Sequence, residues 1–185
     1  MIFGGPQLSP HHHIARTAPE LSAMVAELQT APVRGLDFET NGLRYLNGCH
    51  PIGYSIGYLR DDGAARVWYV PVAHQTPDVM VAPDIARRVF ADSLAGASAL
   101  VGHNLKFDLN MGRANDYEID EDVQLHDTMI QAYMIYERRR FKLESLAEQV
   151  TQHLDWDDAW SMARLVEDYL RNQSKLRGMT YKKSD

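Results

Sequence analysis

The chain has 185 residues, of which 45% are hydrophobic, 24% charged and 9% aromatic, a composition typical of a folded globular protein and not of a disordered or fibrous one. Its net charge of −6 excludes the basic footprint of a general duplex-DNA binder, so a nucleic-acid substrate would have to be met locally. A single cysteine, Cys49, excludes an intramolecular disulfide framework. No stretch approaches the ~20 apolar residues of a membrane span, and we expect a cytoplasmic protein that does not bind a membrane.

The N-terminal region predicts an arm followed by a helix. Residues 1–16 are rich in turn-forming and polar residues, which indicates a flexible arm or a short edge strand. Thr17 and Glu20 then have the spacing of a capping box, with Pro19 in the first turn and apolar residues on one helical face after it. We expect residues 17–185 to form a single domain.

Three strand patterns follow in succession, at 33–39, 52–59 and 65–72. The second and third are rich in aromatic and β-branched residues and are separated by Asp61, Asp62 and Gly63, which predicts an antiparallel hairpin. The three segments together predict an antiparallel meander.

The pattern then changes from strand to helix period. A helix is predicted from Asp84 to Leu94, closed by Gly96, and it leads into a short buried strand at 99–102. A brief strand at 123–125 precedes a helix capped by Asp127, and further helices are predicted from Leu143 and over about 160–170. This order predicts an α/β fold, a mixed sheet flanked by helices, with ligands bound at strand ends near the switch in strand direction.

Two acidic residues lie inside the first strand of the meander. Asp37 and Glu39 are two positions apart, so their side chains project from the same face, while Phe38 points into the opposite layer. Two unpaired carboxylates inside an apolar strand are unfavourable, and a metal or another cation would compensate them. The alternative is a strand end at which both acids simply reach water.

A third acid, Asp108, follows the buried strand that ends at Gly102. It lies in the first turn of the next helix, where an acid alone is more often a helix-opening residue favoured by the dipole. Hydrolysis of a phosphodiester needs a group that generates hydroxide and a group that offsets charge on the leaving oxygen, and two Mg²⁺ ions held by carboxylates supply both.

Together these segments resemble a known family. Residues 36–43 and 102–108 resemble the first and second motifs of the 3′–5′ exonuclease (proofreading) domain of bacterial and phage family A (Pol I type) DNA polymerases, and residues 126–129 and 143–148 resemble its next two landmarks. The resemblance extends from about Ile14 to the end of the chain. It implies a ribonuclease H-like (DEDD) fold, a nuclease that removes nucleotides from the 3′ end of single-stranded DNA during DNA replication, and two divalent metal ions, Mg²⁺ or Mn²⁺.

The resemblance also implies roles for individual residues. Asp37 would bridge both metals, Glu39 would bind one of them and orient the attacking water, and Asp108 would support the second. Asn104 and Lys106 would contact the substrate strand. Thr40, Asn41 and Leu43 correspond to the place where the family holds the terminal nucleotide, although a strand-to-turn connection explains them equally well. We assign Asp127 to helix capping and not to metal binding.

The family has a fourth carboxylate, in a third motif with a tyrosine or a histidine before it. Tyr181 and Asp185 have the tyrosine spacing at the end of the chain, where a carboxylate is poorly held. We expect instead that the domain is truncated before this motif, and that a polymerase domain or a separate chain completes the site.

Three functions therefore stay open: a metal-dependent 3′–5′ exonuclease acting on DNA, a catalytically incomplete exonuclease-like module that binds nucleic acid, and an exoribonuclease of the same superfamily.

Overall fold

The computed structural model describes residues 12–61, 64–74, 80–135 and 143. The chain divides into two compact units, residues 1–134 and 135–185, and the account below concerns the first. Several predicted segments lie outside the described residues. They are the first eleven residues, the helix predicted from Leu143 onward (apart from Leu143 itself), the helix predicted over 160–170, and the segment Tyr181–Asp185.

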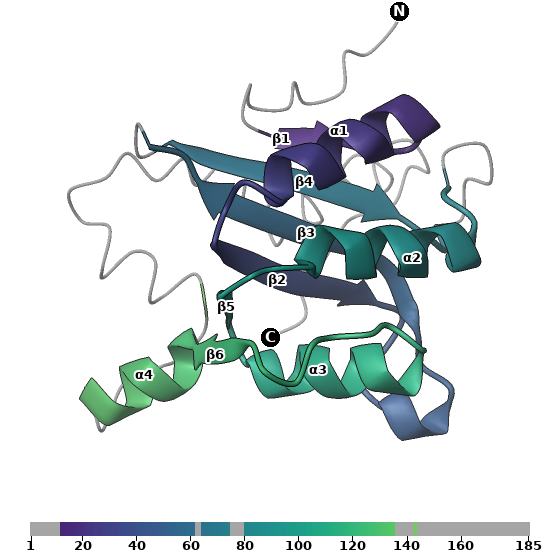
Figure 1. Ribbon diagram of the computed structural model, residues 1–185. Coiled ribbons are helices and arrows are strands. Elements are labelled where there is room, and N and C mark those ends of the chain that lie inside the picture. The colour runs from purple at the N-terminus through teal and green to yellow at the C-terminus, as the bar shows by residue number, and fades with distance from the viewer. Residues whose placement is uncertain (1–11, 62–63, 75–79, 136–142, 144–185) are drawn as a thin grey trace, which may run out of the picture. The chain divides into compact units, whose positions relative to one another are not determined.

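The first unit is built on a six-stranded mixed sheet with the strand order β1-β4-β3-β2-β5-β6 (Figure 1). The predicted meander is confirmed, because β2, β3 and β4 pair antiparallel in succession. The strands β5 and β6 extend the sheet beyond β2 in parallel, and β1 pairs parallel with β4 at the other edge. The strands are β1 (His12–Ile14), β2 (Val33–Thr40), β3 (Pro51–Leu59), β4 (Ala65–Pro71), β5 (Ala99–Gly102) and β6 (Gln124–Asp127).

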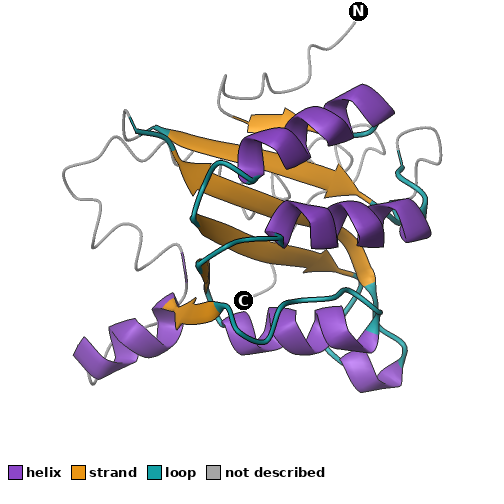
Figure 2. Ribbon diagram, in the orientation of Figure 1, coloured by secondary structure: helices purple, strands orange, loops and turns teal. Residues whose placement is uncertain are grey.

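Among the described residues, the sheet is accompanied by four helices and one 3₁₀ turn. They are α1 (Ala18–Leu28), η1 (Tyr45–Asn47), α2 (Pro83–Leu94), α3 (Leu105–Ala114) and α4 (Thr128–Ile135). Figure 2 shows α1 and α2 side by side over one face of the sheet, which confirms the predicted mixed sheet with flanking helices. No helix in the described part of the chain is long and apolar enough to cross a bilayer.

The predicted capping box at the start of α1 is present. The side-chain oxygen Oε2 of Glu20 accepts hydrogen bonds from the backbone N–H of Thr17 at 2.8 Å and of Arg16 at 2.9 Å. These bonds satisfy donors that a helix start otherwise leaves unpaired. They lower the pKa of Glu20, so the carboxylate stays ionised beside the positive end of the helix dipole.

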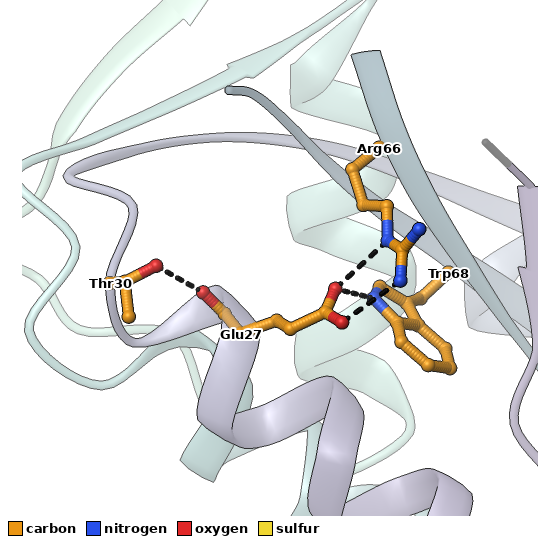
Figure 3. A network of polar contacts seen from close by, with 4 residues as sticks. All are labelled: Glu27, Thr30, Arg66 and Trp68. Carbon is orange, nitrogen blue, oxygen red and sulfur yellow. Dashed lines mark hydrogen bonds and ion pairs between the residues drawn. The ribbon is translucent and has the colours of Figure 1, made fainter. Parts of the chain in front are cut away.

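A polar network fastens α1 to the sheet (Figure 3). The Glu27 carboxylate accepts hydrogen bonds from Nε and Nη2 of Arg66 at 3.0 and 2.9 Å and from the Trp68 indole N–H at 3.0 Å. Burial raises the pKa of Glu27, but these bonds and the Arg66 charge outweigh it, and the net shift is downward. The network fixes α1 on the face of β4 that carries Trp68.

An aromatic cluster forms the core between β2, β3 and α2. Phe38 stacks on Phe90 with ring centroids 5.3 Å apart and meets Tyr54 and Tyr117 edge-on at 6.1 and 5.1 Å. Such offset and edge-to-face contacts are favourable beyond the area that they bury. Phe38 is therefore held firmly, and so is the β2 backbone on either side of it.

One predicted boundary is wrong. The strand expected at 123–125 lies at Gln124–Asp127. This strand pairs only with β5 in the described part of the sheet, and its Leu125 is 50% exposed, so the apolar pattern that locates buried strands is weak here.

Candidate active site

The site begins where β5 stops beside β2. Within β2, β5 pairs with Val33–Gly35, so in the described part of the chain the edge of β2 beyond Gly35 has no strand partner on that side. A Cβ atom at Gly102 would lie 2.7 Å from the Leu105 side chain and 3.1 Å from the Leu36 carbonyl oxygen, so only glycine fits at the end of β5. The chain turns there and continues as α3, which contacts β2.

The turn into α3 is fixed by Asp127. Asn104 adopts a left-handed conformation (φ 61°, ψ 41°), and its backbone N–H donates to Oδ1 of Asp127 at 3.1 Å. The same oxygen accepts the backbone N–H of Met129 at 2.9 Å and of Ile130 at 3.4 Å. The predicted capping role of Asp127 at the start of α4 is thus confirmed, and this residue also joins the two turns that follow β5 and β6.

Asp108 connects α3 to the open edge of β2. Its side-chain oxygen Oδ1 accepts a hydrogen bond from the backbone N–H of Phe38 at 3.0 Å, across 70 positions of sequence, and the residue is only 2% exposed. Phe38 stands between Asp37 and Glu39 in the strand. The Asp108 carboxylate therefore lies at the part of β2 from which both other acids project.

The acids of β2 differ in their exposure. Asp37 is exposed and Glu39 half-buried, whereas their neighbours Leu36 and Phe38 are buried. The expectation that the apolar strand encloses both acids is wrong for Asp37, which reaches water. The reason is that α1 and α2 cover only the face of the sheet that carries the aromatic cluster (Figure 1).

The pKa of each of the three carboxyl groups is raised above its ordinary value. Burial, and secondarily the charge of Asp37, raises the pKa of Asp108 to about 7, although the hydrogen bond from Phe38 acts in the opposite direction. Burial followed by the same Asp37 charge raises the pKa of Glu39. Partial burial of its carboxyl group raises the pKa of Asp37, and the nearby His103 partly offsets this shift. Burial of carboxyl groups, together with the charge of Asp37 beside Glu39 and Asp108, favours a bound cation that would offset both effects.

The donor set fits a hard divalent cation. No hydrogen bond or salt bridge within the described ranges reaches the carboxylate of Asp37 or Glu39, so their oxygens are available. Carboxylate oxygens are the ligands that Mg²⁺ and Mn²⁺ prefer. In the same described part, no three acidic, histidine or cysteine side chains lie close enough together to chelate one ion. Like charges without a cation between them are expected to stay apart.

The predicted nucleotide-binding residues lie in the connection after β2. The Thr40 hydroxyl donates to the Gly42 carbonyl at 2.9 Å, and Asn41 accepts the His50 backbone N–H at 2.8 Å. Both bonds support the interpretation of this segment as a strand-to-turn connection. Leu43 is 80% exposed, so a large apolar side chain is presented to solvent in the connection that follows β2.

The two predicted strand-contacting residues follow β5. Asn104 is exposed, and its side-chain amide has no hydrogen bond to other described residues. Lys106 is exposed and lines a recess of about 300 Å³ between α3 and the β6–α4 turn, together with Leu125 and Ile130. Positions 106 and 108 of a helix point about 200° apart, so Lys106 and Asp108 face different sides of α3. Tyr181 and Asp185 lie outside the described residues.

Sequence reasoning missed three residues near the acids. His103 approaches Asp37 electrostatically, and its Nδ1 lies 3.0 Å from the Thr128 hydroxyl. Tyr69 and His74 form a hydrogen-bonded pair beside Glu39. A signal for Tyr69 exists in the alternation of β4, since a position paired through β3 with Asp37 shares its face. His74 lies in the connection after β4, where no strand or helix periodicity predicts the direction of a side chain.

Comparison with known families decides the class of protein. The family model described as 3′–5′ exonuclease, that of the exonuclease domain of family A DNA polymerases, matches residues 12–184. The chain belongs to this 3′–5′ exonuclease family. The resemblance drawn from the sequence motifs is confirmed at this level. Enzymes of this exonuclease family are hydrolases that use divalent metal ions and act on nucleic-acid 3′ ends.

Solved structures share the fold of this exonuclease domain at low sequence identity. A chain in the structure of the yeast NOT1 MIF4G domain co-crystallized with CAF1 is 11% identical, with a TM-score of 0.60 over 93% of this chain and 92% of that one. The RNase domain of yeast Pop2 is 10% identical, with a TM-score of 0.56 over 78% and 79%. S. pombe Pop2p, in a form that binds Mg²⁺ and Mn²⁺, is 13% identical, with a TM-score of 0.56 over 78% and 83%. These likenesses confirm the ribonuclease H-like fold of DEDD exonucleases.

Proposed function

We propose that this domain removes nucleotides from the 3′ end of single-stranded DNA, in the manner of a proofreading exonuclease, with Asp37, Glu39 and Asp108 as its metal-binding residues. The observation that supports the proposal is the hydrogen bond from the Phe38 backbone to Asp108, which brings the third acid to the strand that carries the other two. All three are oxygen ligands, and the pKa of each is raised by its surroundings.

The two divalent ions, when bound, would lower the pKa of an attacking water and offset charge on the leaving 3′ oxygen. The residues of the chain supply position. Asp108 is held by a backbone hydrogen bond in the core, so its carboxylate stays fixed. Glu39, half-buried on the same strand as Asp37, would orient the water. Such fixed ligands avoid reorganisation during the reaction.

The strand would enter from the exposed side of the acids. Leu43 offers an apolar surface for the terminal base, and Thr40 and Asn41 stand between it and Glu39 in the chain. The amide of Asn104 just beyond the end of β5, which has no hydrogen bond to other described residues, suits a phosphate or sugar oxygen, and Lys106 would add a charge contact further along. Because the whole chain carries a charge of −6, few phosphate contacts are expected, and the salt dependence of binding should be shallow.

The test uses the full chain with 5′-labelled single-stranded DNA and Mg²⁺ or Mn²⁺. We expect shortening of the DNA from its 3′ end, and loss of that activity in Asp37→Ala. The matched control is Asp92→Ala, which removes an exposed acid from α2, outside the acidic site. Unchanged activity in Asp37→Ala would refute the assignment of the site, and binding of the 3′ end without turnover would identify a catalytically incomplete module.

An RNA substrate of the same sequence provides the second arm. An exoribonuclease is the second candidate because the yeast Pop2 RNase domain shares this fold. The 2′-hydroxyl distinguishes the two substrates, so faster degradation of RNA than of DNA would replace the first assignment. Faster hydrolysis after addition of a polymerase domain would identify that domain as a partner that supplies the fourth carboxylate. Within the chain, Tyr181 and Asp185 are the candidates for the motif that carries this carboxylate.

A further inference from the structure

Tyr69 stands on the same face of the sheet as the acids. In the sheet register Asp37 is opposite Ser55, and Ser55 is opposite Tyr69. Directly opposed residues of antiparallel strands project to one face. The side chains of Asp37, Ser55 and Tyr69 thus form a row across β2, β3 and β4, on the face that α1 and α2 do not cover.

The Tyr69 ring reaches into the neighbouring row, which Glu39, Gly53 and Pro71 form. A Cβ atom built on Gly53 would collide with the Tyr69 hydroxyl, so this hydroxyl occupies the place of a Gly53 side chain. Cβ atoms at opposed positions are about 5 Å apart. The Tyr69 hydroxyl therefore lies directly across from the Glu39 side chain.

His74 fixes the position of the hydroxyl. Its Nε2 lies 2.5 Å from the Tyr69 hydroxyl oxygen, and the two rings are nearly perpendicular, with centroids 5.8 Å apart. Both residues are half-buried. Burial raises the pKa of Tyr69 and the negative charge of Glu39 raises it further, which agrees with a Tyr69 side chain close to Glu39.

We propose that Tyr69 and His74 are a positioning pair that limits the Glu39 side chain to the side of the site where Asp37 and Asp108 lie. The inference rests on the proposed role of Glu39 as a metal-binding residue. A glutamate side chain has three rotatable bonds, and no hydrogen bond from other described residues holds this one. The Tyr69 hydroxyl, held by His74, closes the direction toward β4, and Gly53 leaves the room for it.

The test measures metal binding and activity separately. Mn²⁺ affinity is measured on the metal-free full chain by the electron paramagnetic resonance signal of free Mn²⁺, and kcat and KM on labelled single-stranded DNA. Tyr69→Phe removes only the hydroxyl, and His74→Ala removes its partner. For both we expect about tenfold weaker Mn²⁺ binding and about tenfold lower kcat, the range typical of groups that orient metal ligands, with KM for DNA changed less than about twofold.

Two further variants separate positioning from general stability. In His74→Gln the amide can still bond the Tyr69 hydroxyl, so we expect recovery to within about threefold of the wild type. Tyr58→Phe is the matched control, because the Tyr58 side chain projects from the face of β3 opposite to that of Gly53 and Gly57. This substitution should change neither the Mn²⁺ affinity nor kcat. Thermal unfolding confirms that each variant is folded.

Wild-type Mn²⁺ affinity and kcat in Tyr69→Phe and His74→Ala would overturn the inference while leaving the proposed function intact, provided Asp37→Ala is inactive. A raised KM with unchanged kcat would also overturn it, since the pair would then contact DNA. Failure of His74→Gln to recover would assign the pair to fold stability alone. If Asp37→Ala retains full activity, the proposed function fails, and the Mn²⁺ titration still decides the role of the pair.

Discussion

The two faces of β2 differ in how their side chains are packed and hydrogen-bonded. On one face Leu36 and Phe38 are buried, and Phe38 is surrounded by three aromatic rings. On the other, Asp37 and Glu39 carry carboxylates that accept no hydrogen bond from other described residues. One strand thus carries a well-packed aromatic face and an acidic face whose carboxylates have no hydrogen-bond donor among the described residues. The rigidity of the first holds the acids of the second in place, and this difference predicts separate effects of substitution on stability and on activity.

The largest effect on stability is expected on the aromatic face. Phe38→Ala removes a buried ring and leaves a cavity, and should lower the free energy of unfolding by about 3–5 kcal/mol. Urea unfolding of the metal-free chain measures this change. Asp37→Ala, one position away, should stay within about 0.5 kcal/mol of the wild type. Equal destabilisation by the two substitutions would contradict the division between the faces.

A pH-dependent effect is expected at Asp108, which belongs to both regions. Its raised pKa, about 7, means that the folded chain keeps a proton that the unfolded chain releases from about pH 4 upward. The stability of the metal-free wild type should therefore decrease as the pH rises through this window. Asp108→Asn keeps an oxygen for the Phe38 N–H but cannot ionise, so it should match the wild type near pH 4 and exceed it at pH 8 by up to about 4 kcal/mol.

Urea unfolding at the two pH values, with a chelator present, measures that difference. If Asp108 has the proposed role of a metal ligand, the same variant should lose at least about 100-fold in kcat, more than variants of residues that only orient such a ligand. Parallel pH profiles of stability for the two proteins would show that Asp108 is not the titrating group.

The smallest effect is expected at the turns that hold the site. Asp127→Ala removes the acceptor for three backbone N–H groups and should cost about 1 kcal/mol by thermal unfolding. The control is Asp120→Ala, which removes a single side-chain-to-backbone bond, to Asp122, in an exposed loop and should cost less. Asp127→Ala should also weaken DNA binding modestly, since Asn104 loses its fixed backbone. Equal costs for the two variants would argue against the double role of Asp127.

Local patterns predicted most of this architecture. Alternation of apolar residues located β2, β3 and β4 within two residues, and the Thr17–Glu20 spacing located the start of α1. The common face of Asp37 and Glu39 was predictable because a two-residue spacing fixes it in any strand, whereas the roles proposed for these acids came from the family resemblance. Asp127 was assigned correctly because capping depends only on its own helix.

Contacts between segments that are distant in the sequence could not be predicted from such local patterns. The hydrogen bond from Phe38 to Asp108 depends on where β5 ends against β2, which pairing decides and composition does not. The exposure of Asp37 depends on which face the helices cover. The meeting of Tyr69 with His74 depends on the path of the chain after β4, and a connection carries no period from which to predict it.

The separation of Asp108 from β2 in the sequence also determines when the three acids come together during synthesis and folding. During synthesis the ribosome releases β2 and its acids well before α3, and the contact that completes the group spans 70 positions. Closure of so long a loop is entropically slow to nucleate, and sheet pairing between β2 and β5 has to come with it. The nascent chain is therefore expected to stay inert until α3 has left the exit tunnel and packed against β2.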